Sequence, residues 1–132
     1  MSCGHKFGFQ LFFLYIHFMK QKLAIIGSRT FNDYKTLREY LDPQKEKISL
    51  VVSGGAKGAD TLGERWAKEN NIETLIFPAE WDKHGKKAGF IRNHDIIKNC
   101  DICVAFWDGK SKGTKHSLDL CKQYNKPFLV IG

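Results

Sequence analysis

Three short segments combine glycine with polar or charged residues, and each directly follows an apolar run. They are residues 27–31, 53–60 and 107–114. Glycine lets backbone N–H groups approach an anion, arginine pairs with oxyanions, and the start of a helix presents free N–H groups. This combination predicts the binding of an anionic, nucleotide-like ligand. It leaves open whether a reaction follows.

The second segment, residues 53–60, matches neither the G-x-x-x-x-G-K-[ST] nor the G-x-G-x-x-G spacing. A glycine-rich turn between a strand and a helix can still form an anion-binding nest. The alternative is a tight turn that needs glycine for a positive φ. Asp60 either caps the following helix or faces a ribose hydroxyl, and we expect capping because aspartate is favoured at helix starts.

The third segment contains Ser111, Gly113 and Thr114, where a helix is predicted to begin. Their hydroxyl and N–H groups suit a phosphate at the helix N-terminus. An ordinary N-cap at Ser111 or Thr114 is compatible with this role, because the cap leaves other N–H groups free. Trp107 precedes them and either stacks on a base or packs into the core.

Two further places add charge and polarity. Arg29 follows the first apolar run and can pair with an oxyanion through two hydrogen bonds. Arg92 and Asn93 lie beyond the basic cluster at residues 83–87, which is either the rim of an anion site or a solvated loop. Asn93 either contacts an amide or ribose edge or lies on a plain helix surface.

The candidate ligand-binding residues come from all of these segments. They are Gly27, Ser28, Arg29, Ser53, Gly54, Gly55, Gly58, Asp60, Arg92, Asn93, Trp107, Asp108, Ser111, Gly113 and Thr114. The chain shows no Ser-His-Asp order, metal-binding cluster or paired catalytic carboxylates. We therefore expect no metal and no cofactor, and we assign no catalytic residue.

The pattern of apolar residues predicts one α/β domain that positions these segments. The expected strands are residues 22–27, 49–53, 74–77, 101–106 and 127–131, and the expected helices are residues 34–41, 59–70, 88–99 and 114–124, with a loop at 79–87. Strands alternating with helices form a parallel sheet covered on both faces. We expect a Rossmann-like, three-layer fold with strand order 3-2-1-4-5. That order brings the three segments to one crevice.

The chain divides at its N-terminal end into an extension and the domain. Residues 1–18 are largely apolar but too short to span a bilayer, and they lack the cleavage site of a secretory signal. We interpret them as an extension from an upstream start. An added edge element or a partner-binding segment is the alternative. The domain is expected to occupy residues 19–132.

Charge and cysteine content restrict the setting. The net charge of +7 favours anionic partners. Cys100 and Cys103 form a C-x-x-C, but Cys103 lies inside a predicted strand rather than at the start of a helix. We interpret the cysteines as buried residues of a cytoplasmic protein, with no membrane association.

The segments together resemble the YspA-like branch of the SLOG superfamily, which also contains the DprA DNA-processing proteins and the LOG phosphoribohydrolases. The resemblance rests on G-S-R-x-F at 27–31, S-G-G-A-x-G-A-D at 53–60, A-G-x-x-R-N at 88–93 and W-D-G-x-S-x-G-T at 107–114. It implies a Rossmann-like fold that binds nucleotides or molecules derived from them. LOG enzymes carry P-G-G-x-G-T-x-x-E, and Ser117 stands at the place of that glutamate.

Three hypotheses follow. The first is a domain that binds a nucleotide-derived small molecule, either as a single chain or as a homo-oligomer. The second is a nucleotide hydrolase or phosphoribohydrolase-like enzyme, with Asp60, Asp108 or Asp119 as its carboxylates. The third is a DprA-like binder of single-stranded nucleic acid, which would show steep salt dependence and aromatic side chains along an extended groove. The signals of this chain converge on one pocket, which favours the first.

Overall fold

The computed structural model describes residues 20–132, so the proposed extension at residues 1–18 lies outside the described residues. The strands are β1 (Gln21–Gly27), β2 (Ile48–Ser53), β3 (Glu73–Ile76), β4 (Ile102–Phe106) and β5 (Phe128–Ile131). The helices are α2 (Tyr34–Leu41), α3 (Ala59–Glu69), α4 (Trp81–His84), α5 (Ala88–Lys98) and α6 (Lys112–Gln123), with 3-10 turns η1 (Asp42–Lys47) and η2 (Gly85–Lys87).

The five strands form one parallel sheet in the order β3-β2-β1-β4-β5, which confirms the predicted fold and strand order. The middle of the sheet pairs β1 with β4, from Leu23 opposite Ile102 to Gly27 opposite Phe106. Strands buried on both faces are expected to be continuously apolar, and every residue of β4 is buried. The winding direction reverses between β1 and β4. The loops that leave the carboxyl ends of these two strands therefore run to opposite faces of the sheet and open a crevice between them.

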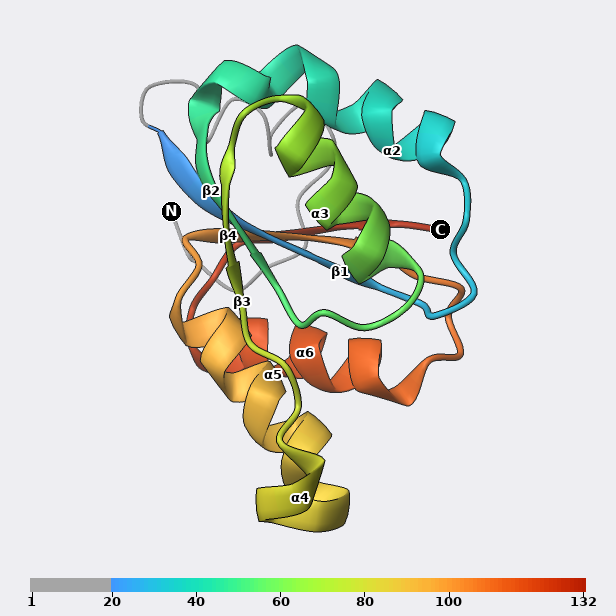
Figure 1. The fold of residues 1–132 in the computed structure, drawn as a ribbon, viewed down its shortest axis with the longest axis vertical. Helices are drawn as coiled ribbons and strands as arrows, with labels where there is room; N and C mark the ends of the chain where they lie inside the picture. The colour runs from blue at the N-terminus through green and yellow to red at the C-terminus, as the bar shows by residue number, and fades with distance from the viewer. Residues whose placement is uncertain (1–19) are drawn as a thin grey trace.

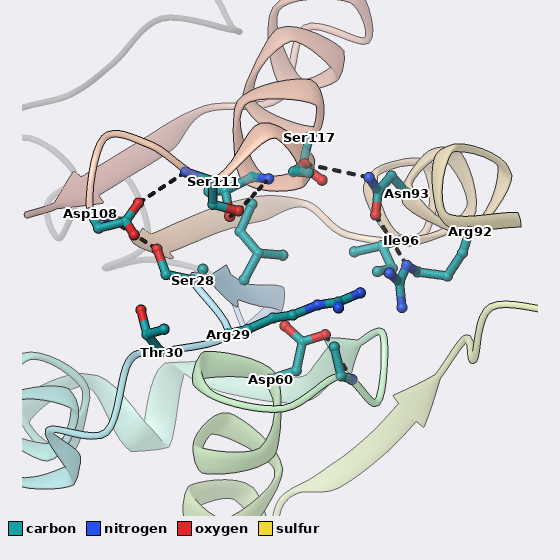
Figure 2. A pocket seen from close by; sticks show the side chains of 15 residues that line it. Ser28, Arg29, Thr30, Asp60, Arg92, Asn93, Ile96, Asp108, Ser111 and Ser117 are labelled. Atoms are coloured by element: carbon teal, nitrogen blue, oxygen red, sulfur yellow. Dashed lines mark hydrogen bonds between the residues drawn. The ribbon is translucent and has the colours of Figure 1, made fainter. Parts of the chain in front are cut away.

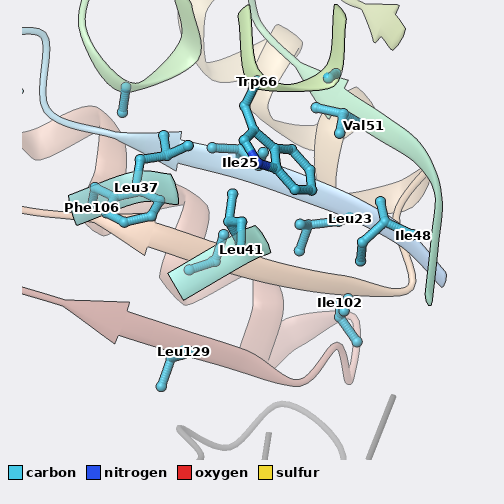
Figure 3. Packing of buried hydrophobic residues seen from close by; sticks show 13 residues of the cluster. Leu23, Ile25, Leu37, Leu41, Ile48, Val51, Trp66, Ile102, Phe106 and Leu129 are labelled. Carbon is cyan, nitrogen blue, oxygen red and sulfur yellow. The ribbon is translucent and has the colours of Figure 1, made fainter. Parts of the chain in front are cut away.

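Helices cover the two faces of the sheet and enclose two apolar clusters (Figure 1). Helices α2 and α3 pack against one face, where Trp66 is fully buried and donates from Nε1 to Asp42 Oδ1 at 2.8 Å. Figure 3 shows the Trp66 ring between Ile25 and Val51 in this cluster. Helices α5 and α6 pack against the other face, whose cluster includes Cys100, Cys103 and Cys121. These three cysteines are buried and free, as predicted.

The connection between β3 and α5 differs from the prediction. Residues 79–87 were expected to be a loop, but they form the short helix α4 and the turn η2. Gly85 adopts a φ of 59°, a left-handed conformation that ends α4 and that glycine accepts without strain. Figure 1 shows α4 projecting from the body of the domain. No helix within residues 20–132 is long and apolar enough to cross a membrane.

Candidate ligand-binding site

A cavity of about 360 Å³ opens at the carboxyl ends of β1 and β4, beside the starts of α3 and α6 and one side of α5. Figure 2 shows the side chains that face it. Its lining residues are Ile26, Gly27, Ser28, Arg29, Thr30, Ala56, Asp60, Arg92, Asn93, Ile96, Asp108, Ser111, Gly113, Thr114 and Ser117. Segments far apart in the sequence thus meet where an open α/β sheet commonly binds ligands.

Ser28 joins the ends of β1 and β4 at this cavity. Its backbone N–H donates to Phe106 O at 3.0 Å, and its Oγ accepts from the backbone N–H of Asp108 at 3.0 Å. The side chain is therefore buried and held in place by two strands. This rigid link fixes the spacing between the first and third sequence segments.

The start of α6 forms one wall of the cavity. Ser111 is the N-cap residue, and its Oγ accepts from the N–H of Thr114 at 3.4 Å. The Asp108 carboxylate accepts from the N–H groups of Lys110 and Ser111 at 2.8 and 3.0 Å, which lowers the pKa of Asp108. These bonds leave the N–H groups of Lys112 and Gly113, in the first turn, without an intrahelical partner.

Arg29 and Arg92 both line the cavity, and their side chains point toward one another in Figure 2. Arg92 donates from Nη1 to Gly54 O at 2.8 Å and from Nε to Asn93 Oδ1 at 3.1 Å. Its pKa is lowered by burial, and the charge of Arg29 lowers it further while Asp60 opposes the shift. Arg29 is exposed, and its side chain extends across the cavity in Figure 2. A bound anion would relieve the repulsion between the two cations.

Asp60 is the buried acid of the cavity. It is 7% exposed and accepts from the N–H of Ala56 at 3.2 Å. Burial raises its pKa to about 6, although the hydrogen bond and the charge of Arg92 act in the opposite direction. The expectation that Asp60 caps α3 is wrong, because Gly58 occupies the N-cap position and Asp60 lies inside the helix. Asp60 therefore keeps its proton to a higher pH than an exposed aspartate does.

Asn93 connects α5 to α6 across the cavity wall. It is 7% exposed, its Nδ2 donates to Gly113 O at 3.4 Å, and it lies 3.2 Å from Nδ1 of His116. It is therefore not on a plain helix surface. Its amide is engaged by protein groups, which makes it a positioning residue for the start of α6.

Five of the candidate residues do not line this cavity. They are Ser53, Gly54, Gly55, Gly58 and Trp107. Ser53 is fully buried and donates to Glu64 Oε2 at 2.5 Å. Gly54 and Gly58 contact neighbouring chain segments, since an added Cβ would lie 2.6 Å from Arg92 Nη1 or 2.3 Å from Ser28 O. Gly54 and Gly58 of the second segment therefore pack against protein, whereas Ala56 and Asp60 of the same segment line the cavity.

Trp107 faces a different cavity. Its Nε1 donates to Ser111 O at 3.1 Å, and its ring packs partly against the apolar cluster beneath α5 and α6. It lines an adjoining cavity of about 380 Å³, which shares Ser28, Thr30 and Asp108 with the first. The ring is thus beside the first cavity rather than inside it.

Five residues that line the cavity were not predicted from the sequence, and one candidate carboxylate, Asp119, does not line it. The missed residues are Ile26, Thr30, Ala56, Ile96 and Ser117. Helical spacing could have found two of them, because Ser117 follows Thr114 by three positions and Ile96 follows Asn93 by three. Asp119 does not line the cavity, and its carboxylate pairs with Lys115 Nζ at 3.1 Å on the exposed surface of α6.

The parallel sheet with a cavity at its switch point defines a Rossmann-like α/β domain. A model of the YspA, cpYpsA-related SLOG family matches residues 21–84. The Gene 61 protein of Mycobacterium phage D29 is 33% identical over an alignment of 121 residues, and the match covers 85% of this chain and 97% of the phage protein. The chain belongs to the YspA-related SLOG family.

A solved structure is also similar to this chain. It is that of DNA processing protein A from Helicobacter pylori, reported for its single-stranded DNA binding mode. The TM-score is 0.64 at 24% sequence identity, and the match covers 89% of this chain and 68% of that one. This similarity shows that the two proteins share a fold.

Proposed function

We propose that this protein binds a nucleotide or nucleotide-derived molecule, with its phosphate between Arg29, Arg92 and the start of α6. The observation that carries the proposal is the convergence of two guanidinium groups and free helix N–H groups on one cavity. A cavity of about 360 Å³ accommodates a ligand of nucleotide size. Thr30 and Asp60 supply polar groups for ribose hydroxyls.

The family and the fold support a role in binding nucleotides or nucleic acid. DNA processing protein A, which shares the fold, is described by its binding of single-stranded DNA. The net charge of +7 is compatible with such a partner. We favour the small ligand because the charged groups converge on one cavity, whereas a strand of nucleic acid requires contacts along a groove.

Hydrolysis of the bound ligand is the second candidate function, and Asp60 favours it. A carboxyl whose pKa is raised to about 6 can act as a general acid or base near neutral pH. Ser117 lines the cavity at the place where LOG enzymes carry glutamate, so this chain lacks that carboxylate. Binding without turnover is therefore the primary proposal.

The test is a thermal-shift screen with nucleoside phosphates, dinucleotides and ADP-ribose, followed by calorimetric titration of any compound that stabilises the protein. Arg29→Ala should weaken binding by about 1.5–3 kcal/mol through loss of a charge-assisted hydrogen bond. Arg29 is exposed, so the unliganded protein should unfold as the wild type does. Arg38→Ala, which removes an exposed arginine on α2 away from the cavity, is the matched control.

The competing functions give different results in the same samples. Release of base or phosphate that Asp60→Asn abolishes would establish hydrolysis. Binding of an oligonucleotide with a steep salt dependence, and no small-molecule shift, would favour the nucleic acid. If Arg29→Ala and Arg38→Ala bind a small-molecule hit equally tightly, the ligand does not occupy this cavity.

A further inference from the structure

The edge strand β3 is the least covered element of the sheet. All four of its residues are exposed, and the side chains of Leu75 and Ile76 are 36% and 42% exposed. The large exposed hydrophobic side chains of residues 20–132 all fall between positions 75 and 91: Leu75, Ile76, Trp81, Phe90 and Ile91. The opposite edge differs, since β5 begins with two buried residues. Leu75 and Ile76 lie on β3 itself, and exposed apolar side chains on an edge strand mark a contact surface.

The backbone of β3 also has hydrogen-bonding groups that face away from the sheet. The N–H of Phe77 donates to Ser53 O of β2 at 2.8 Å. Because alternate residues of a strand direct their polar groups to the same side, Leu75 also faces β2, and Thr74 and Ile76 face outward. The strand contains no proline, lysine or bulge of the kind that protects an edge from pairing.

The charges around this edge favour a second copy of the chain over a nucleic acid. Residues 73–91 contain three acidic side chains (Glu73, Glu80, Asp82) and three basic ones (Lys83, Lys86, Lys87), so the segment is neutral within a chain of net charge +7. Two copies repel each other least through a neutral surface with both signs of charge. A polyanion gains little from the same surface.

We propose that two copies of this protein associate by antiparallel pairing of β3 with β3, which joins their sheets into one. A two-fold axis perpendicular to the joined sheet keeps each residue and its copy on the same face. Because side chains alternate between the faces along a strand, two residues that lie opposite each other must both have even numbers or both have odd numbers. Pairing Thr74 with Ile76 uses outward groups on both strands and leaves out Pro78, which has no N–H. It also leaves out Ile72, whose N–H already donates to Ala67 O.

This register places Leu75 opposite Leu75 of the second copy. The two Leu75 residues form a non-hydrogen-bonded pair of the antiparallel ladder, in which the opposed Cα atoms approach to about 4.5 Å. Leu75 would then be covered by its symmetry mate, which accounts for an apolar side chain at an exposed strand. The ligand cavity takes no part, so this proposal is independent of the proposed function.

Sedimentation velocity on the full chain over a range of concentrations tests the association. We expect a reversible dimer, and Leu75→Lys should weaken it by roughly 100-fold or more because two lysines would face each other. Gln123→Lys, which adds the same charge at an exposed position of α6, should leave the dimer intact. Thermal unfolding of each variant establishes that the fold is retained.

Disulfide formation tests the register. Leu75→Cys should crosslink to itself under mild oxidation, since its Cα separation lies within the disulfide range of about 4.4–6.8 Å. Ile76→Cys should not, because the two copies of residue 76 would be diagonal neighbours about 7–8 Å apart. Both variants carry Cys3→Ser, and the described cysteines are buried.

Three results would overturn the proposal. The first is a monomer at every concentration. The second is a dimer that Leu75→Lys does not weaken. The third is crosslinking of Ile76→Cys as efficient as that of Leu75→Cys.

Discussion

The two glycine-rich loops beside the cavity use glycine for opposite purposes. In the loop from β2 to α3, a Cβ at Gly58 would lie 2.3 Å from Ser28 O, so the glycine allows two chain segments to touch. At Gly113, in the first turn of α6, a Cβ would meet no atom within 4 Å, and the residue lines the cavity. The first loop is packed against protein and the second is open to a ligand.

The aspartates of the two loops show the same contrast between a packed and an open environment. Asp60, after the first loop, is buried, and its pKa is raised to about 6. Asp108, in the second, is exposed, and backbone N–H groups lower its pKa. A glycine near an aspartate in the sequence therefore does not predict whether the loop packs against protein or faces a ligand. The density of surrounding atoms decides whether the loop supports the site or forms its surface.

Substitution at Gly58 should give the largest effect. Gly58→Ala combines a φ of 79° with overlap against backbone atoms, and it should lower the free energy of unfolding by about 3 kcal/mol or more. Gly109→Ala is the matched control, because Gly109 has a φ of 81° but open space around it. It should cost only the strain of a left-handed residue, about 1 kcal/mol.

Urea denaturation of both alanine variants measures the difference. Equal losses at Gly58 and Gly109 would mean that backbone conformation alone matters. The distinction between a packed and an open loop would then be incorrect.

The pH dependence of stability should separate the two acids. Burial raises the pKa of Asp60 in the folded protein to about 6, above the ordinary aspartate pKa of 3.8, so its contribution to stability is fully present below pH 3.8 and is lost as pH rises through 6. The size is on the order of 2–3 kcal/mol. Asp108 has a lowered pKa, so its contribution is present above the unfolded pKa and is lost as pH falls through the folded one.

Chemical denaturation from pH 3 to pH 8 checks this prediction against Asp60→Asn and Asp108→Asn. Relative to the wild type, Asp60→Asn should gain stability as pH rises toward 7. Asp108→Asn should be less stable than the wild type near neutral pH, and this difference in the free energy of unfolding should shrink as pH falls below 4. A constant difference between wild type and Asp60→Asn across this range would contradict a raised pKa for Asp60.

Substitution at Gly113 should give the smallest effect on stability but a clear effect on binding. Gly113→Ala removes a glycine from a helix at a position with free space, and it should raise the free energy of unfolding by about 0.5 kcal/mol. The added methyl group projects at the cavity wall and should reduce the thermal shift caused by a phosphate-containing ligand. Unchanged binding in the titration would place the phosphate away from the start of α6.

Much of the fold could be predicted because local patterns and global topology agree. Helix α2 has the predicted bounds, Tyr34–Leu41, since Asp33 caps it through the N–H of Thr36 and apolar residues recur at helical spacing. The predicted strand order 3-2-1-4-5 is confirmed, and right-handed crossovers in that order place helices on both faces of the sheet. Helix α4 was missed because four residues give no measurable periodicity.

The candidate site was predictable in part for a different reason. Arg29, Asp60, Arg92 and Gly113 all line the cavity, because residues that follow strands of one parallel sheet must meet at its carboxyl edge. Trp107 was ambiguous in the sequence, because an aromatic side chain at a strand end satisfies both base stacking and packing. In the structure, the hydrogen bond from Trp107 Nε1 to Ser111 O holds the ring beside the first cavity.

The sequence by itself determined the parallel α/β fold, its strand order, and which segments meet at one edge, because these depend on hydrophobic periodicity and the handedness of the chain. Only the tertiary structure decided that Asp60 is buried rather than a helix cap, that Gly58 faces Ser28 rather than a ligand, and that β3 is left uncovered. Those properties depend on which atoms from distant segments fill the space around a residue. Local sequence does not encode that occupancy.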